Sequence, residues 1–251
     1  MSGHSKWSTI KRKKGAEDAK RGKIFTRLAR DIMVAARESG GDENSNPKLK
    51  LAVQKARAAN MPKDNIERAI KKGTGELDGG QMEELTYEAY GPDGVAFLID
   101  VLTDNKNRTL ADVKYVFNRG GGSLASAGSV QWQFEQKGYL TLKNEGIDFE
   151  EVFMVAAEAG AEDVTEEDEY IVIYTPRDKF GAVEQALAES GYELEDSELR
   201  WEPQNATQTS IETAMKNLKI TEQLEELDDV QTVSSNLMLT DDVLAVYEAQ
   251  P

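Results

Sequence analysis

The spacing of apolar residues changes near Glu84, where the first strand-like runs begin, and this change limits the folds that the sequence can adopt. Before it, between residues 22 and 73, apolar residues recur with the period of an α-helix. After it, runs such as 94–103 are rich in β-branched and aromatic residues and end in turn residues, which is typical of strands. The pattern predicts an α+β protein in which a helical unit precedes the sheets.

The helical part divides at glycines and prolines. We expect three helices, at about 22–39, 47–59 and 63–72. Asn46 suits the N-cap of the second helix, and Pro47 suits its first position. The stretch "GTGELDGG" at 73–80 then predicts a linker to the sheets.

The segment between residues 138 and 201 has the order strand, helix, strand, strand, helix, strand, which is that of a ferredoxin-like fold. We expect its strands at 138–143, 161–165, 169–175 and 193–201 and its helices at 148–159 and 177–190. Around it we expect strands at 84–90, 94–103 and 129–136, a helix capped by Thr109, and near the end a helix at 209–227 and a strand at 229–239. Since the last two elements have no sheet of their own, we expect them to complete a second, permuted ferredoxin-like unit.

The predicted architecture therefore has three domains. A basic N-terminal helical bundle with a flexible arm takes residues 1–75. A discontinuous ferredoxin-like domain takes 81–136 together with 204–240, and a third domain, also ferredoxin-like, takes 137–203 and is inserted into the second.

The formal net charge of −16 conceals two parts of opposite sign. Residues 1–75 hold 19 of the 30 Lys and Arg and 8 of the 46 Asp and Glu, a net charge of +11, so the rest of the chain carries −27. A cationic end on an anionic body favours a polyanion as partner. We expect nucleic acid and no membrane, because no apolar run approaches the ~20 residues that span a bilayer.

The compartment is indicated by two absences in the sequence. The chain has no cysteine, which excludes disulfides and fits a reducing environment. The polar N-terminus differs from the apolar core of a signal peptide. We therefore expect a cytoplasmic protein.

Cations gather near the start of the chain. In the arm "SGHSKWSTIKRKK" at 2–14 they accompany Trp7, whose indole can stack on an unpaired base or pack back onto the helical bundle. On the first helix, four cations line the face opposite the apolar one. The candidate nucleic-acid-binding residues are His4, Lys6, Trp7, Lys11, Arg12, Lys13, Lys14, Lys20, Arg21, Lys23, Arg27, Arg30 and Arg37. Lys106 and Arg108 are candidate secondary contacts, although their loop at 103–109 equally suits the cap of the following helix.

Catalytic chemistry finds little support in the sequence. His4 is the only histidine and has no partner for a Ser-His-Asp arrangement, and one His without Cys argues against zinc. The glycine-rich stretch at 118–130 follows a helix and lacks the Gly-Lys-Ser/Thr ending of a phosphate loop. Acidic pairs such as Glu166-Glu167 fall at strand edges, where solvation explains them. We predict no catalytic residue, no cofactor and no metal.

Several long motifs occur in a fixed order along the chain. They are "GHSKW" (3–7), "AKRGKIFTRL" (19–28), "GGDENSNPKLKLAVQKARAANMPKDNIERAIKKG" (40–73), "YEAYGPDGVAFLIDVLTDNKNRT" (87–109), "GGSLASAGSV" (121–130) and "DDVQTVSSN" (228–236). Together they closely resemble the YebC/PmpR family, which includes the mitochondrial translational activator of cytochrome oxidase subunit I. The stretch "STIKRKKGAED" departs from the family's more usual "ANIKHRKAAQD", so Arg12 or Lys13 replaces a histidine and no imidazole role is expected there.

The resemblance implies a three-domain cytoplasmic protein and two alternative functions. Bacterial members are generally described as DNA-binding transcriptional regulators, whereas the mitochondrial relatives look like translation factors. The expected function is therefore a non-enzymatic, nucleic-acid-binding regulator of gene expression. The alternative is a ribosome-associated translation factor that binds rRNA and relieves stalling on proline-rich nascent sequences. The acidic domains would contact protein partners, and the sequence does not indicate an oligomeric state.

Overall fold

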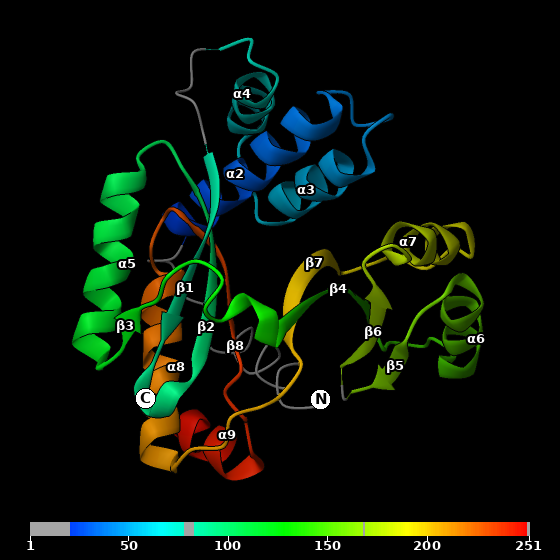
Figure 1. Ribbon diagram of the computed structural model, residues 1–251. Coiled ribbons are helices and arrows are strands. Elements are labelled where there is room, and N and C mark those ends of the chain that lie inside the picture. Colours follow the sequence, from blue (N-terminus) through cyan, green and yellow to red (C-terminus); the bar gives the residue numbers. More distant parts are fainter. Residues whose placement is uncertain (1–20, 78–82, 168, 250–251) are drawn as a thin grey trace.

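The computed structural model describes residues 21–77, 83–167 and 169–249, with side chains from Phe25 onward (Figure 1). It combines helices with two four-stranded antiparallel sheets, so the predicted α+β class is confirmed. Figure 1 shows the helical unit above the two sheets, which lie side by side.

The helical unit consists of three helices: α2 (Arg21–Ser39), α3 (Pro47–Ala58) and α4 (Lys63–Gly73). Asn46 caps α3 as predicted, because its Oδ1 accepts the N–H of Leu49 at 3.0 Å. Its Nδ2 donates to the carbonyl oxygens of Ala35 at 2.7 Å and Gly40 at 2.8 Å, at the end of α2. A single buried amide therefore links the start of α3 to the end of α2.

The first sheet has the strand order β3 (Ser123–Leu124), β1 (Glu83–Tyr90), β2 (Ala96–Thr103), β8 (Val230–Ser235). Helices α5 (Lys106–Gly120) and α8 (Ile211–Glu225) pack on one face of it. Strand β2 alternates accordingly: Phe97 and Ile99 join the core under these helices, while Ala96 and Leu98 join a smaller cluster on the other face.

The second sheet has the strand order β5 (Asp163–Glu166), β6 (Tyr170–Pro176), β4 (Phe134–Lys143), β7 (Asp196–Pro203). Helices α6 (Phe149–Ala159) and α7 (Phe180–Glu189) cover one face of it. The chain order is βαββαβ and the first strand lies between the third and the fourth, which confirms the ferredoxin-like unit.

Two elements differ from the prediction. The segment 129–136 is not a strand of the first sheet, since Gln131–Gln133 forms a 3₁₀ turn (η3) and β4 of the second sheet begins at Phe134. The buried Glu88 carboxylate causes this turn by accepting the backbone N–H groups of Gly128, Val130 and Gln131, which an extended strand cannot direct at one side chain. The two-residue β3 takes the place of the expected strand.

The other difference is the C-terminal helix α9 (Asp241–Glu248), which the sequence analysis missed. Thr240 caps it, and Val243, Leu244 and Tyr247 bury its apolar side in the core of the first sheet. The boundaries predicted for the three domains stay a prediction, and β4 begins before the expected boundary at 136/137.

Candidate nucleic-acid interface

Only some of the predicted contact residues can be placed. His4, Lys6, Trp7, Lys11, Arg12, Lys13, Lys14 and Lys20 lie outside the described residues, as do the side chains of Arg21 and Lys23. The structure describes the side chains of Arg27, Arg30, Arg37, Lys106 and Arg108.

Arg30 of α2 faces the first sheet and not solvent. Its Nη2 donates to Oδ1 of Asp229 at 2.7 Å, and the two side chains are only 12% and 8% exposed. Arg30 thus lies on the polar side of α2, but in this arrangement it is buried against Asp229, and its contact with nucleic acid stays a prediction. Helical periodicity marks a polar face, but the acidic body covers part of it.

Asp229 directly precedes β8 and collects donors from three elements. Besides Arg30, its carboxylate accepts from Arg108 Nη2 at 2.8 Å, Thr109 Oγ1 at 2.6 Å and Thr103 Oγ1 at 3.2 Å. Burial alone raises the pKa of the Asp229 carboxyl, but the hydrogen bonds from Thr109 and Arg108 and the charge of Arg30 outweigh burial and hold the pKa below its ordinary value.

The two secondary contacts are also engaged within the chain. Arg108 is 49% exposed but pairs with Asp104 at 2.9 Å as well as with Asp229, and Lys106 pairs with Glu83. The loop caps α5 through Asn105, whose Oδ1 accepts the N–H of Arg108. Of the two interpretations left open for this loop, the cap is found, but Asn105 and not Thr109 provides it.

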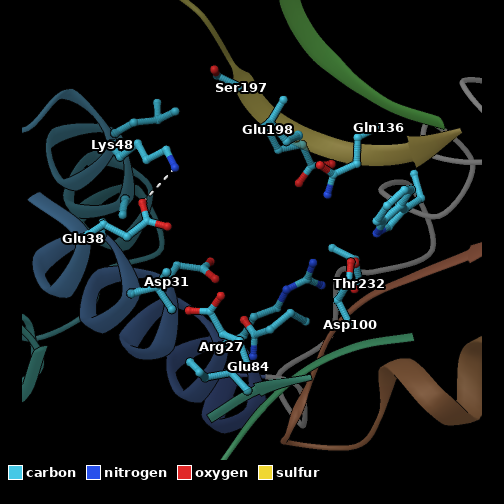
Figure 2. A pocket seen from close by; sticks show the side chains of 18 of the residues that line it. Arg27, Asp31, Glu38, Lys48, Glu84, Asp100, Gln136, Ser197, Glu198 and Thr232 are labelled. Atoms are coloured by element: carbon cyan, nitrogen blue, oxygen red, sulfur yellow. Dashed lines mark hydrogen bonds and ion pairs between the residues drawn. The ribbon is translucent and has the colours of Figure 1, made fainter. Parts of the chain in front are cut away.

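Arg27 lines a cleft of about 520 Å³ between α2, α3 and the two sheets. Figure 2 shows its side chain, with those of Asp31 and Glu198, projecting into this space. Six of the lining residues are acidic: Asp31, Glu38, Glu84, Asp100, Glu184 and Glu198. The cleft is thus unsuited to a phosphate backbone, because carboxylates outnumber the cations that line it.

The pKa of the Asp31 carboxyl is raised in this cleft. Burial raises the pKa of its carboxyl, Glu198 adds to the rise, and the charges of Arg27 and Lys55 oppose it. Among the described residues, Asp31 has neither a hydrogen bond nor an ion pair through its side chain. Nearby, Lys55 of α3 pairs with Asp196 of β7 at 2.7 Å, so α3 is held to the second sheet as α2 is held to the first.

Exposed cations remain on the outer side of the helical unit. Lys50 of α3 and Arg68, Lys71 and Lys72 of α4 are exposed and form no ion pair with any residue in the described ranges. Arg37, near the end of α2, is exposed too. None of these four exposed cations of α3 and α4 is among the predicted contact residues, although the helical pattern of α4 already places Arg68, Lys71 and Lys72 on the side away from the buried Ile66.

No helix in the described ranges is long and apolar enough to cross a membrane. Nor do His, Cys, Asp and Glu side chains gather there in a group that could hold a metal ion.

Comparisons with known proteins match nearly the whole chain. Residues 5–76 match the family model described as the TACO1/YebC protein N-terminal domain, and residues 82–237 match the model of the TACO1/YebC second and third domain. A protein of Leptospira biflexa named probable transcriptional regulatory protein is 54% identical over 244 residues, 97% of this chain and 99% of the relative. A protein of Fusobacterium nucleatum with the same description is 49% identical over 245 residues, 97% of this chain and 98% of the relative. The crystal structure of a conserved hypothetical protein of Aquifex aeolicus is similar with a TM-score of 0.82 at 44% identity, covering 90% of this chain and 94% of that one.

Proposed function

The chain belongs to the TACO1/YebC family, and we therefore propose that it is a non-enzymatic regulator of gene expression that binds nucleic acid through its helical unit. The relatives' description as transcriptional regulators favours DNA as the target. The observation that carries the proposal is the separation of charge: residues 21–77 hold 13 Lys and Arg against 7 Asp and Glu, on a body that is strongly acidic.

The contact surface consists of the outer faces of α3 and α4 together with the arm. Lys50, Arg68, Lys71 and Lys72 are exposed, and no carboxylate within the described ranges pairs with them. Cations of this kind displace counterions from phosphates, which makes binding strong at low salt and weak at high salt. The acidic sheets stay away from the same polyanion and are left to contact protein partners in the cytoplasm.

A ribosomal RNA target is the second candidate. The arm at 2–14 combines cations with glycine and a single tryptophan, a composition that suits stacking on unpaired bases better than reading a duplex groove. The outer face of α3 carries Lys50, Gln54 and Arg57, of which Arg57 is paired with Glu43, so few side chains are arranged to read base edges. The protein would then act as a translation factor on the ribosome.

The test of the surface is a fourfold substitution to glutamine at Lys50, Arg68, Lys71 and Lys72. We expect weaker binding of a labelled 20-base-pair DNA duplex and a salt slope reduced by up to about four, since each cation that contacts a phosphate contributes roughly one. The matched control removes four exposed cations of the body: Lys114, Arg177, Lys179 and Lys219. Equal effects of the two sets would refute the surface.

The nature of the target is decided in cells. Crosslinking followed by sequencing yields promoter DNA if the protein regulates transcription and rRNA if it acts on the ribosome. Cosedimentation with ribosomes at low salt supports the second candidate, and a preferred sequence in a DNA selection supports the first.

A further inference from the structure

The surroundings of Asp229 resemble a site for a phosphate group. Two guanidinium groups, from Arg30 and Arg108, and two hydroxyl groups, from Thr103 and Thr109, converge on one small buried anion. Such charge-assisted donors are those that proteins use for phosphate as well as for carboxylate. Here the anion belongs to the chain itself.

Arg30 does not use its full capacity in this pair. Only Nη2 bonds to Asp229, and Nη1 is buried without a hydrogen-bond partner. A guanidinium can bind two oxygen atoms of one phosphate side by side, so a phosphate would satisfy Arg30 better than Asp229 does. A buried donor without a partner has a cost that such an exchange would remove.

In the observed arrangement a nucleic acid cannot make this contact. A cavity of about 600 Å³ adjoins Arg30, but Asp104, Asp112, Glu226 and Asp228 line it together with Asp229. These carboxylates repel a phosphate for as long as α2 lies on the first sheet. Arg30 therefore becomes available only when the helical unit moves away from the sheet.

We propose that Asp229 acts as an internal substitute for phosphate that latches α2 onto the first sheet and competes with the nucleic-acid backbone for Arg30. The proposal rests on the nucleic-acid binding proposed above and assigns a regulatory contact to it. Release is feasible because no charge is abandoned: Asp229 keeps Arg108, Thr103 and Thr109, while Arg30 passes to a phosphate. The other link, between Lys55 and Asp196, has side chains that are 29% and 27% exposed, so it holds α3 less firmly.

The experiment compares two substitutions at neighbouring positions. Asp229→Asn removes the latching charge. Asp228→Asn removes an equal charge from the next residue, which lines the same cavity but is exposed and has no ion pair in the described part of the chain, so this variant measures the loss of repulsion alone. Each variant is titrated by fluorescence anisotropy with a labelled 20-base-pair DNA duplex and with an RNA duplex of the same sequence. If the latched state holds about nine molecules in ten, Asp229→Asn tightens binding about tenfold. The two duplexes distinguish the sources of the phosphate.

A second measurement needs no ligand. The chain has no cysteine, so spin labels attach only at Gln54→Cys on α3 and Asn118→Cys on α5, two exposed positions. Pulsed electron paramagnetic resonance then reports the distance between the helical unit and the first sheet. We expect a longer or broader distance distribution in Asp229→Asn and an unchanged one in Asp228→Asn.

The outcomes separate the two proposals. If the wild type binds neither duplex, binding to duplex nucleic acid is refuted, and the distances still decide whether the latch exists. The latch is overturned if Asp229→Asn and Asp228→Asn give the same distance distribution. It is also overturned if Asp229→Asn binds the duplex no more tightly than Asp228→Asn does. If Asp229→Asn unfolds, Arg30→Gln removes the same ion pair through its other partner. We expect Arg30→Gln to lengthen the distance between the spin labels without tightening the binding of the duplex. An unchanged distance overturns the proposal.

Discussion

Replacing Glu88 by glutamine should release the loop that leads from the first sheet to the second. Glu88 lies on β1, is 6% exposed and accepts three backbone N–H groups, from Gly128 at 2.5 Å, Val130 at 2.6 Å and Gln131 at 3.1 Å. The first bond uses Oε1 and the other two use Oε2. A glutamine has one acceptor oxygen, so its amide group must face at least one of these N–H donors.

The size of the effect follows from this geometry. The amide group most simply replaces Oε1, because Oε2 serves two donors and can stay an acceptor. The hydrogen bond from Gly128 to a charged acceptor is then lost, which costs about 1.5–3 kcal/mol, while its partly buried N–H can still reach water. We expect Glu88→Gln to lower the free energy of unfolding by roughly 2–3 kcal/mol. Urea denaturation followed by circular dichroism measures it, and Glu84→Gln on the same strand is the control, since Glu84 is exposed.

The effect should also depend on pH. Burial alone raises the pKa of Glu88, but the N–H groups of Val130, Gly128 and Gln131 outweigh burial and hold the pKa below its ordinary value of 4.5. A carboxyl with a lowered pKa stabilises the fold fully above 4.5 and loses this contribution as the pH falls through the folded value. The difference between wild type and Glu88→Gln should therefore narrow in acid. A difference that is absent at pH 7, or that stays constant down to pH 3, would refute the reasoning.

Two further substitutions test the helical unit and the cleft. Asn46→Asp keeps the cap of α3 but points a charge at the carbonyl oxygens of Ala35 and Gly40, so we expect the free energy of unfolding in urea to fall by about 2–4 kcal/mol. Asn46→Ser should lower it less, and the reverse order would contradict this account. Asp31→Asn should raise the midpoint of thermal unfolding at pH 7, because burial raises the pKa of Asp31 and so disfavours its charged form. This gain should fade as the pH falls through the raised pKa, where the wild-type carboxyl becomes neutral; a gain that persists in acid would exclude the charge as its cause.

Local signals in the sequence predicted most of the fold. Asn46 and Pro47 mark the start of α3 with side chains whose chemistry acts within one turn, and the βαββαβ order follows from alternating spacing over short segments. The missed helix α9 has only eight residues, which is too short for a clear helical pattern. Its apolar side can be recognised only when the core of the first sheet, in which it is buried, is known.

The errors arose where a distant side chain overrides a local preference. The residues at 129–136 have the composition of a strand, but Glu88, about forty positions earlier, draws their N–H groups into a turn. Threonine is a residue type that often caps helices, yet the hydroxyl of Thr109 donates a hydrogen bond to Asp229, 120 positions later. Spacing along the chain contains no information about such partners, because the fold alone brings them together.

The same limit explains what became of the cationic face of α2. Periodicity correctly places Arg27 and Arg30 away from the apolar side of the helix, and a polar side of a helix usually faces solvent. In a chain whose other part carries −27, however, a cationic face has two candidate partners, an external polyanion and the chain's own carboxylates. The carboxylates are always present, so the inner cations of α2 and α3 pair with Asp229 and Asp196, while Lys50, Arg68, Lys71 and Lys72 stay exposed. Charge separation along a sequence thus predicts attraction between the parts as firmly as it predicts binding to nucleic acid.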